Sequence, residues 1–199
     1  HKNGCPLYAY EFNGYWKDVG TLESYWQANM ELIDIVPEFN LYEEYWKIYT
    51  KSETLPPQYL SSDSVIERSI VGEGSEIYGK VYNSVIGRNV VIGKDAVIRD
   101  SIIMNDVTIG DGSECNKIIV AEGTVIGKGS VLGIGEEREN ELDSRIYNSG
   151  LVTIGEKTVI PDNVRIGKNT VILGHTTPED YPNGVLESGK ALIKGGDEA

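Results

Sequence analysis

The chain has 199 residues, of which 18 are Lys or Arg and 31 are Asp or Glu, so its formal net charge at pH 7 is −13. This balance disfavours a nucleic-acid or anionic-membrane partner, because both need clustered positive charge. Residues 1–60 hold 13 of the 17 aromatic side chains but only 3 of the 23 glycines. Two architectures joined in one chain explain this difference better than a single uniform core.

The sequence contains neither a membrane segment nor a disulfide framework. No apolar run approaches the roughly 18 residues of a membrane span. The two cysteines, Cys5 and Cys115, fall in the two different parts of the chain. Such sparse use of cysteine is typical of a reducing compartment. We therefore expect a cytoplasmic protein.

The first part predicts a strand followed by a helix. Residues 7–12 alternate weakly between apolar and polar side chains, which favours a short strand. Thr21 is a suitable N-cap, and Glu23 in the first turn would interact favourably with the helix dipole. Apolar side chains then recur at helical spacing until Pro37, where we expect the helix to end.

A second, shorter helix is predicted through Leu41, Tyr45 and Ile48, and Pro56-Pro57 predicts a stiff, extended linker. A fragment of this size cannot bury three Trp by itself. We expect these aromatic side chains to pack on the following part or on a domain that the chain lacks.

The second part repeats itself every 17 residues, as in Ser84-Val85-Ile86-Gly87, Ser101-Ile102-Ile103-Met104 and Ile118-Ile119-Val120-Ala121. Within each repeat an aliphatic residue recurs at every sixth position. Smaller residues follow four positions later, as Val90, Ala96 and Ile102 follow Ile86, Ile92 and Ile98. This step is neither helical nor a plain alternation. It predicts a coil with three short strands per turn, whose aliphatic side chains fill a narrow prism.

Seven of the aliphatic positions are followed directly by glycine. We expect each of these glycines to adopt a positive φ at a corner of the coil. The pairs are Val71-Gly72, Ile86-Gly87, Ile92-Gly93, Ile109-Gly110, Ile126-Gly127, Ile154-Gly155 and Ile166-Gly167.

Two segments depart from the repeat. Residues 134–150 are charged and predict an excursion that projects from the coil. Residues 175–199 contain Pro178, Pro182 and Asn183-Gly184, so we expect an irregular tail with one short strand at 190–194. Because a solenoid needs its open ends covered, this tail is interpreted as a cap.

The residues with the strongest chemical signal lie in Gly14-Tyr15-Trp16-Lys17-Asp18-Val19-Gly20-Thr21. Asp18 precedes a glycine turn and a helix start. This place suits a carboxylate that holds Mg²⁺ against phosphate oxygens, since Mg²⁺ prefers one or two carboxylates together with substrate oxygens. The alternative is structural: Asp18 caps the turn and Trp16 is buried packing.

This run, together with Ser24–Asn29, closely resembles the end of the catalytic domain in the glucose-1-phosphate adenylyltransferase (ADP-glucose pyrophosphorylase) family. The Trp-x-Asp-x-Gly core also occurs in other sugar-nucleotide pyrophosphorylases. Three further features narrow the resemblance to the glucose-1-phosphate adenylyltransferase family: the longer run, the Tyr-Trp-Gln-Ala-Asn helix, and the hexapeptide coil after a proline-rich linker. The resemblance covers essentially the whole chain.

The resemblance implies a mainly β fold. Residues 56–199 would form a single-stranded, left-handed parallel β-helix of hexapeptide repeats, and residues 1–55 would be a small α/β remnant of a nucleotidyltransferase domain with a linker helix. Such a handedness would depart from the usual right-handed crossover. The family's Gly-rich nucleotide loop, the acidic partner of Asp18 and the sugar-phosphate contacts have no counterpart here, so we expect a C-terminal portion that is inactive alone.

The resemblance also implies an activity, in which the phosphate of glucose 1-phosphate attacks the α-phosphorus of ATP to give ADP-glucose for glycogen synthesis. Asp18 would be a catalytic residue that holds Mg²⁺ and positions the sugar phosphate, and Trp16 would line the glucose site. The coil would assemble a homotetramer and respond to a phosphorylated metabolite. Basic residues available for such an effector are Arg88, Lys94, Arg99, Arg138, Arg145 and Lys157, none of which the sequence singles out.

Two other classes of function remain open at this point. One is a hexapeptide-repeat acyltransferase with a His as general base, for which only His1 and His175 exist. The other is a non-catalytic oligomerisation module. Binding of acetyl-CoA would favour the acyltransferase, whereas binding of a sugar phosphate would favour the pyrophosphorylase.

Overall fold

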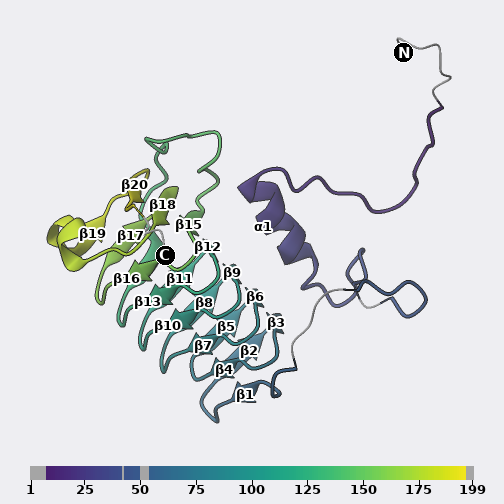
Figure 1. Cartoon of the computed structure of the whole chain (residues 1–199), viewed down its shortest axis with the longest axis horizontal. Helices are drawn as coiled ribbons and strands as arrows, with labels where there is room; N and C mark the ends of the chain where they lie inside the picture. The colour runs from purple at the N-terminus through teal and green to yellow at the C-terminus, as the bar shows by residue number, and fades with distance from the viewer. Residues whose placement is uncertain (1–7, 42, 50–53, 196–199) are drawn as a thin grey trace.

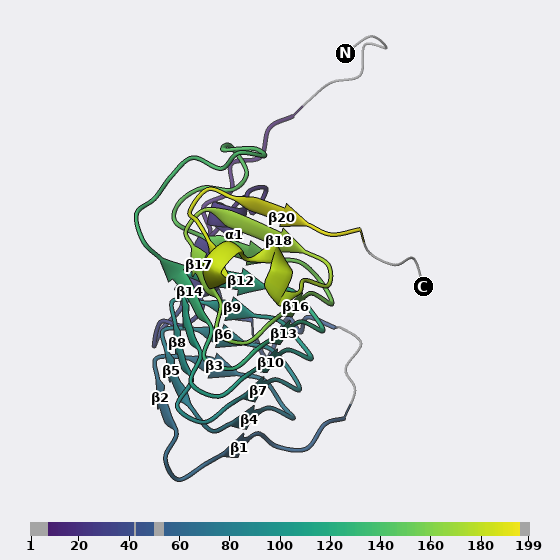
Figure 2. The same cartoon turned by 90° about the vertical axis from the view of Figure 1, so that its left-hand side faces the viewer.

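The computed structural model describes residues 8–41, 43–49 and 54–195, so Leu7 and Cys5 lie outside the described residues. From Tyr59 onward the chain winds into a three-sided coil of parallel strands (Figures 1 and 2). Each side of the coil is one sheet, and successive strands of a sheet come from successive turns. The predicted parallel β-helix is therefore confirmed.

The first sheet contains, in order, β1 (Tyr59–Leu60), β4 (Glu76–Ile77), β7 (Val91–Ile92), β10 (Thr108–Ile109), β13 (Val125–Ile126) and β16 (Val159–Ile160). The second contains β19 (Val185–Leu186), β17 (Arg165–Gly167), β14 (Val131–Ile134), β11 (Glu114–Asn116), β8 (Val97–Arg99), β5 (Lys80–Tyr82) and β2 (Val65–Glu67). The third contains β20 (Ala191–Ile193), β18 (Thr170–Leu173), β15 (Val152–Ile154), β12 (Ile118–Val120), β9 (Ile102–Ile103), β6 (Val85–Ile86) and β3 (Ile70–Val71).

The register of the sheets follows the 17-residue repeat. Ile86 pairs with Ile103 in the third sheet, as Ile92 pairs with Ile109 in the first. These side chains are buried in a continuous core that fills the coil. Small residues, among them Ser101, are also fully buried where two sides meet. Ile102, predicted to occupy such a position, instead faces outward, because the step before Ile103 is five residues rather than six.

The seven glycines after aliphatic residues do not have a positive φ, so this prediction was wrong. At six of them a Cβ would lie 2.3–2.7 Å from a backbone atom in the next turn, for example 2.6 Å from the Lys128 nitrogen at Gly110. At Gly155 a Cβ would instead meet the Leu173 side chain at 2.3 Å. Close approach between turns, rather than backbone conformation, requires glycine there.

Positive φ occurs elsewhere at the corners, and Asn or Asp often adopts it. Asn89, Asp95, Asp106 and Asn163 have φ between 54° and 58°. Asn and Asp tolerate this region because their short polar side chains bond locally. The Asn89 amide, for example, donates to Asp106 Oδ1 in the next turn at 2.6 Å.

The helix α1 (Leu22–Glu31) confirms the predicted N-cap. The Ser24 amide donates to Thr21 Oγ1 and the Thr21 amide donates to Ser24 Oγ, each at 3.1 Å. The helix ends at Glu31 rather than at Pro37, since Leu32 is the C-cap and Ile33 beyond it is buried. The helix therefore ends well before Pro37 is reached.

One side of α1 packs on the outer face of the third sheet, beside β9 and β12 (Figure 1). Leu22, Tyr25, Trp26 and Met30 contact a small cluster of Ile102, Ile119 and Leu151. Trp26 Nε1 donates to the Asp100 carbonyl at 2.7 Å, and Lys117 Nζ lies 5.1 Å from the centre of the Trp26 ring. The helix is therefore docked on the coil by apolar and polar contacts together.

Two predicted elements do not form among the described residues. Residues 8–12 have no neighbouring strand in the described chain, and Tyr8, Tyr10 and Phe12 are exposed. An unpaired strand has no ladder of hydrogen bonds to stabilise it. The predicted helix through Leu41, Tyr45 and Ile48 is absent from 43–49, where the exposed apolar side chains offer no packed face.

After β14 the chain leaves the coil and returns at β15, as predicted for the charged excursion (Figure 2). The tail holds two short 3₁₀ turns, Pro178–Asp180 and Pro182–Gly184, followed by β19 and β20. Tyr181 between the two turns joins the main core and is only 2% exposed. Its hydroxyl lies 2.8 Å from Thr176 Oγ1. The tail thus covers the end of the coil, and none of the described helices is long and apolar enough to cross a membrane.

Candidate functional site

Asp18 lies in an exposed turn that leads into α1. Its Oδ1 atom accepts a hydrogen bond from the Gly20 amide at 2.9 Å, which closes a local turn just before the N-cap Thr21. The other carboxylate oxygen has room for a further ligand, because the residue is exposed. The structural and the functional interpretation of Asp18 are thus compatible: the carboxylate shapes the turn and also faces solvent.

Trp16 is 75% exposed, so it is not the buried packing residue that the structural alternative describes. It borders a hollow of about 370 Å³ whose other walls include Tyr15, Tyr25, Asn29 and Phe39. The rings of Tyr15 and Phe39 are stacked, with centroids 5.6 Å apart. An aromatic hollow with a few polar groups can bind the apolar face of a ring-shaped ligand. Asp18 does not line it.

The segment before α1 is tied to the end of the same helix by Glu31. The Tyr15 hydroxyl donates to Glu31 Oε2 at 2.8 Å, and Lys17 Nζ forms an ion pair with Glu31 Oε1. The hydrogen bond from Lys17 and then that from Tyr15 lower the pKa of the Glu31 carboxyl, while the pKa of Tyr15 is raised by the same contact. Sequence reasoning missed Glu31, because helical periodicity marks it only as an exposed position.

A Mg²⁺ ion would find one hard oxygen donor at Asp18. Among residues 8–41, 43–49 and 54–195, no three His, Cys, Asp or Glu side chains are grouped to hold a metal ion. Asp18 therefore fits as a single protein ligand whose remaining partners would come from substrate or from another part of the protein. The donor chemistry fits, but these residues alone cannot build the site.

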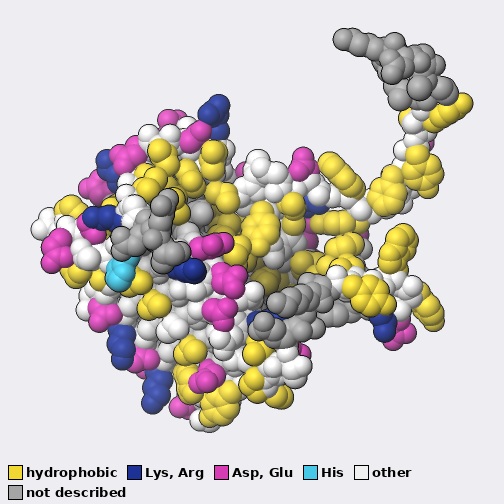
Figure 3. All heavy atoms as spheres, in the orientation of Figure 1, with side chains coloured by type: hydrophobic (Ala, Val, Ile, Leu, Met, Phe, Trp, Pro, Cys, Tyr) yellow, Lys and Arg dark blue, Asp and Glu magenta, His cyan; other side chains and the backbone are white. Residues whose placement is uncertain are grey.

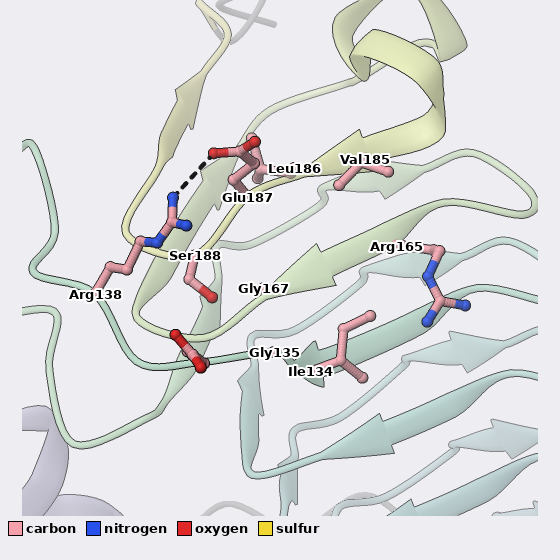
Figure 4. A pocket seen from close by; sticks show the side chains of 10 residues that line it. Ile134, Gly135, Arg138, Arg165, Gly167, Val185, Leu186, Glu187 and Ser188 are labelled. Atoms are coloured by element: carbon pink, nitrogen blue, oxygen red, sulfur yellow. Dashed lines mark hydrogen bonds and ion pairs between the residues drawn. The ribbon is translucent and has the colours of Figure 1, made fainter.

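None of the hollows in the described part of the chain is lined by two of the six candidate basic residues. Arg145 pairs with Asp143 at 2.8 Å, and the Arg99 guanidinium lies 4.1 Å from the centre of the Tyr82 ring. Figure 4 shows Arg138 beside a hollow of about 330 Å³, pointing toward Glu187 at 3.2 Å. That hollow also includes Arg165 and Glu136, so its two cations are balanced by two carboxylates.

His175, the remaining candidate for an acyltransferase base, is exposed after the last full turn. Its backbone forms an isolated bridge with Val159. The excursion between β14 and β15 contains no His. No described feature of the chain favours the acyltransferase interpretation.

Comparison with family models matches the two parts of the chain separately. Residues 58–154 match "GlmU-like, C-terminal hexapeptide", and residues 1–35 match "Nucleotidyl transferase". The second match includes Trp16, Asp18 and the whole of α1. One match therefore falls on the coil and the other on the segment that precedes it and on α1.

Curated relatives match nearly the whole chain. Glucose-1-phosphate adenylyltransferase from Lachnospira eligens is 62% identical over 195 residues, which is 98% of this chain and 46% of that protein. The enzymes of the same name from Acetivibrio thermocellus and Thermotoga maritima are each 46% identical over 98% and 96% of this chain. These matches cover 46% and 45% of the two proteins. The chain thus spans about half the length of the curated relatives it matches.

Among solved structures, GDP-perosamine N-acetyl transferase from Caulobacter crescentus matches 70% of this chain and 51% of its own chain. The identity is 17% and the TM-score 0.36. A likeness at this level carries no argument about function.

Proposed function

We propose that this chain, which is homologous to glucose-1-phosphate adenylyltransferases over nearly all of its length, is the C-terminal part of such an enzyme. The observation that carries the proposal is the 62% identity over 98% of the chain. The whole protein would convert ATP and glucose 1-phosphate into ADP-glucose and pyrophosphate for glycogen synthesis, in the cytoplasm. The coil would support a homotetramer and a response to a phosphorylated metabolite.

In this reaction an oxygen of the glucose 1-phosphate forms a bond to the α-phosphorus of ATP, and the bond from that phosphorus to the bridging oxygen of pyrophosphate breaks. Such phosphoryl chemistry depends on positioning and on neutralising negative charge. Bound Mg²⁺ supplies charge neutralisation on the phosphate oxygens. Asp18 would hold that ion and orient the sugar phosphate, and Trp16 would bind the glucose ring at the aromatic hollow.

The exposed apolar side chains before the coil support the fragment interpretation. Tyr10, Trp16, Tyr45 and Trp46 are among the exposed aromatic residues, and Figure 3 shows hydrophobic side chains gathered on this side of the molecule. Apolar patches of this kind mark interaction surfaces. We propose that residues 1–55 are the C-terminal end of a nucleotidyltransferase domain whose remainder is not in this chain.

The test is synthesis of ADP-glucose by the whole protein and by this chain alone. With ATP, glucose 1-phosphate and Mg²⁺, we expect the whole protein to release pyrophosphate and the isolated chain to release none. In the whole protein, Asp18→Asn should lower kcat/KM by about a hundredfold. Asp34→Asn, a matched exposed carboxylate, should change it less than twofold. Activity of the isolated chain, or equal effects of both variants, would overturn the proposal.

A further inference from the structure

Glu31 forms a clamp on the segment that carries the candidate site. It is the last residue of α1, and its two carboxylate oxygens bind two different side chains, Tyr15 and Lys17. These donors are two residues apart and reach one carboxylate. That is the arrangement of an extended segment, in which alternate side chains share a side.

The clamped residues are next to both candidate site residues. Tyr15 and Lys17 are half-buried against Glu31, whereas Trp16 and Asp18 are exposed. Trp16 lies between the two clamped residues and borders the same hollow as they do, whereas Asp18 directly follows Lys17 and does not line that hollow. The contacts to Glu31 therefore fix the chain on both sides of Trp16 and directly before Asp18.

The clamp works because α1 is itself held at its start and in its middle. At its start, the capping box of Thr21 and Ser24 fixes the turn that follows Asp18. In its middle, Trp26 is bonded to the Asp100 carbonyl of the coil. The segment from Tyr15 to Thr21 thus runs between two points of a helix that is docked on the third sheet.

We propose that Glu31 is a positioning residue that orients Asp18 and Trp16 toward the sugar phosphate through its contacts to Lys17 and Tyr15. The inference rests on the proposed function, in which Asp18 and Trp16 contact that substrate. The hydrogen bonds from Lys17 and Tyr15 lower the pKa of the Glu31 carboxyl, as expected for a carboxylate that accepts at both oxygens. Because the ion pair is exposed, its contribution to global stability is small, and its effect is local order.

The first experiment measures the clamp itself in the whole protein. Glu31→Ala is compared with Glu23→Ala, which removes the same charge from the first turn of the same helix. We expect amide hydrogen exchange in residues 15–20 to become about tenfold faster in Glu31→Ala only, with a melting temperature equal to that of Glu23→Ala. Unchanged exchange in residues 15–20 would overturn the inference.

The second experiment measures substrate binding. Glu31→Ala should weaken glucose 1-phosphate binding in calorimetry and raise its KM, each about tenfold, with a smaller change in kcat. Glu31→Gln should lie between wild type and Glu31→Ala, because an amide keeps one acceptor oxygen. The double variant of Glu31→Ala and Lys17→Met should be no weaker than Glu31→Ala, since both act through one contact.

Two results separate the inference from the proposed function. If the wild-type whole protein makes no ADP-glucose, the proposed function fails, and with it the positioning role. The other result has three parts: the wild type is active, exchange rises in Glu31→Ala, and the binding and KM of glucose 1-phosphate in Glu31→Ala stay within twofold of those in Glu23→Ala. The proposed function then stands. In that case the positioning role of Glu31 is overturned.

Discussion

At each corner of the coil, the neighbouring turn decides which residue the position accepts. Gly110 must be glycine because a Cβ would lie 2.6 Å from the Lys128 nitrogen. Gly112, two residues on, has a φ of +67° but nothing within 4 Å of a built Cβ. Asp95 and Asn163 have φ values of 57° and 58°. Asp95 and Asn163 occupy the same corner position in other turns as Gly112 does in its own. Within one turn, Gly110 is therefore required by the close approach of the next turn, whereas Gly112 is favoured by its positive φ.

This difference predicts opposite outcomes for two substitutions. Gly110→Ala should lower the free energy of unfolding by roughly 2 kcal/mol or more, because turns of the coil must move apart. Gly112→Asn should change it by no more than about 0.5 kcal/mol, since Asn tolerates the left-handed region. Urea unfolding followed by circular dichroism measures both. Equal losses would show that close approach between turns is not the constraint.

Cys115 makes stability depend on alkaline pH. The side chain lies in the stack between Ile98 and Leu132, and burial raises the pKa of its thiol to about 12 from 9.0. The unfolded thiol loses its proton near pH 9 while the folded one retains it. The buried thiol therefore makes its full contribution to the free energy of unfolding below pH 9, and this contribution is lost as the pH rises toward 12.

In a Cys5→Ser background, the free energy of unfolding should fall by roughly 1.4 kcal/mol per pH unit above pH 9 on account of this thiol. Cys115→Val places an aliphatic side chain in the stack and should remove that part of the slope. Urea titrations at pH 8, 9.5 and 10.5 compare the two proteins. Parallel slopes would contradict the assignment of the pH dependence to Cys115.

At the scale of elements, α1 depends on its contact with the coil. It has no fully buried residue of its own, and its apolar side packs on the small cluster around Ile102 and Ile119. A ten-residue helix is marginal in water without tertiary packing. The bond from Trp26 to the Asp100 carbonyl therefore matters more here than it would in a large core.

Trp26→Phe keeps an aromatic ring but removes the N–H donor. We expect α1 to lose about 1 kcal/mol of local stability. Hydrogen-exchange protection over Leu22–Glu31 should then fall about fivefold. Gln27→Ala, on the exposed side of the same helix, should leave protection within twofold. A loss that extends equally through the coil would mean that α1 does not open independently.

The sequence predicts well those elements whose stabilising contacts follow a short, regular spacing along the chain. Ile86, Ile103 and Val120 stack because each turn reproduces the same spacing, so periodicity alone predicts the coil. Thr21 and Ser24 are three residues apart, so the N-cap is also local. The helix predicted through Leu41, Tyr45 and Ile48 failed because these apolar side chains are exposed and so gain little from packing.

The candidate site was only partly predictable for the same reason. Trp16 and Asp18 lie within one short motif, and sequence reasoning finds them by resemblance. Glu31 is 14 residues from Lys17 along the chain, and their contact depends on how α1 returns past the segment. No local spacing encodes that return, so the clamp became visible only in the structure.

At the scale of the whole molecule, the coil is a one-dimensional stack whose ends need covering. Each turn contacts mainly its two neighbours, so the last turn has a partner on one side only. The tail supplies the other partner: Tyr181 inserts into the end of the main core. Thr176 Oγ1 lies between the Tyr181 hydroxyl and the Val159 carbonyl, 2.8 and 2.6 Å away.

Tyr181→Ala should therefore expose the end of the stack. We expect it to lower the free energy of unfolding by about 3–5 kcal/mol, because a large buried ring is lost. It should also cause concentration-dependent association, since an uncovered end presents apolar side chains and unpaired strand edges. Tyr181→Phe keeps the ring and should lower stability by only about 1 kcal/mol, with no association. Urea unfolding and sedimentation velocity over a concentration series distinguish the two variants, and a monodisperse, fully stable Tyr181→Ala would refute the capping role.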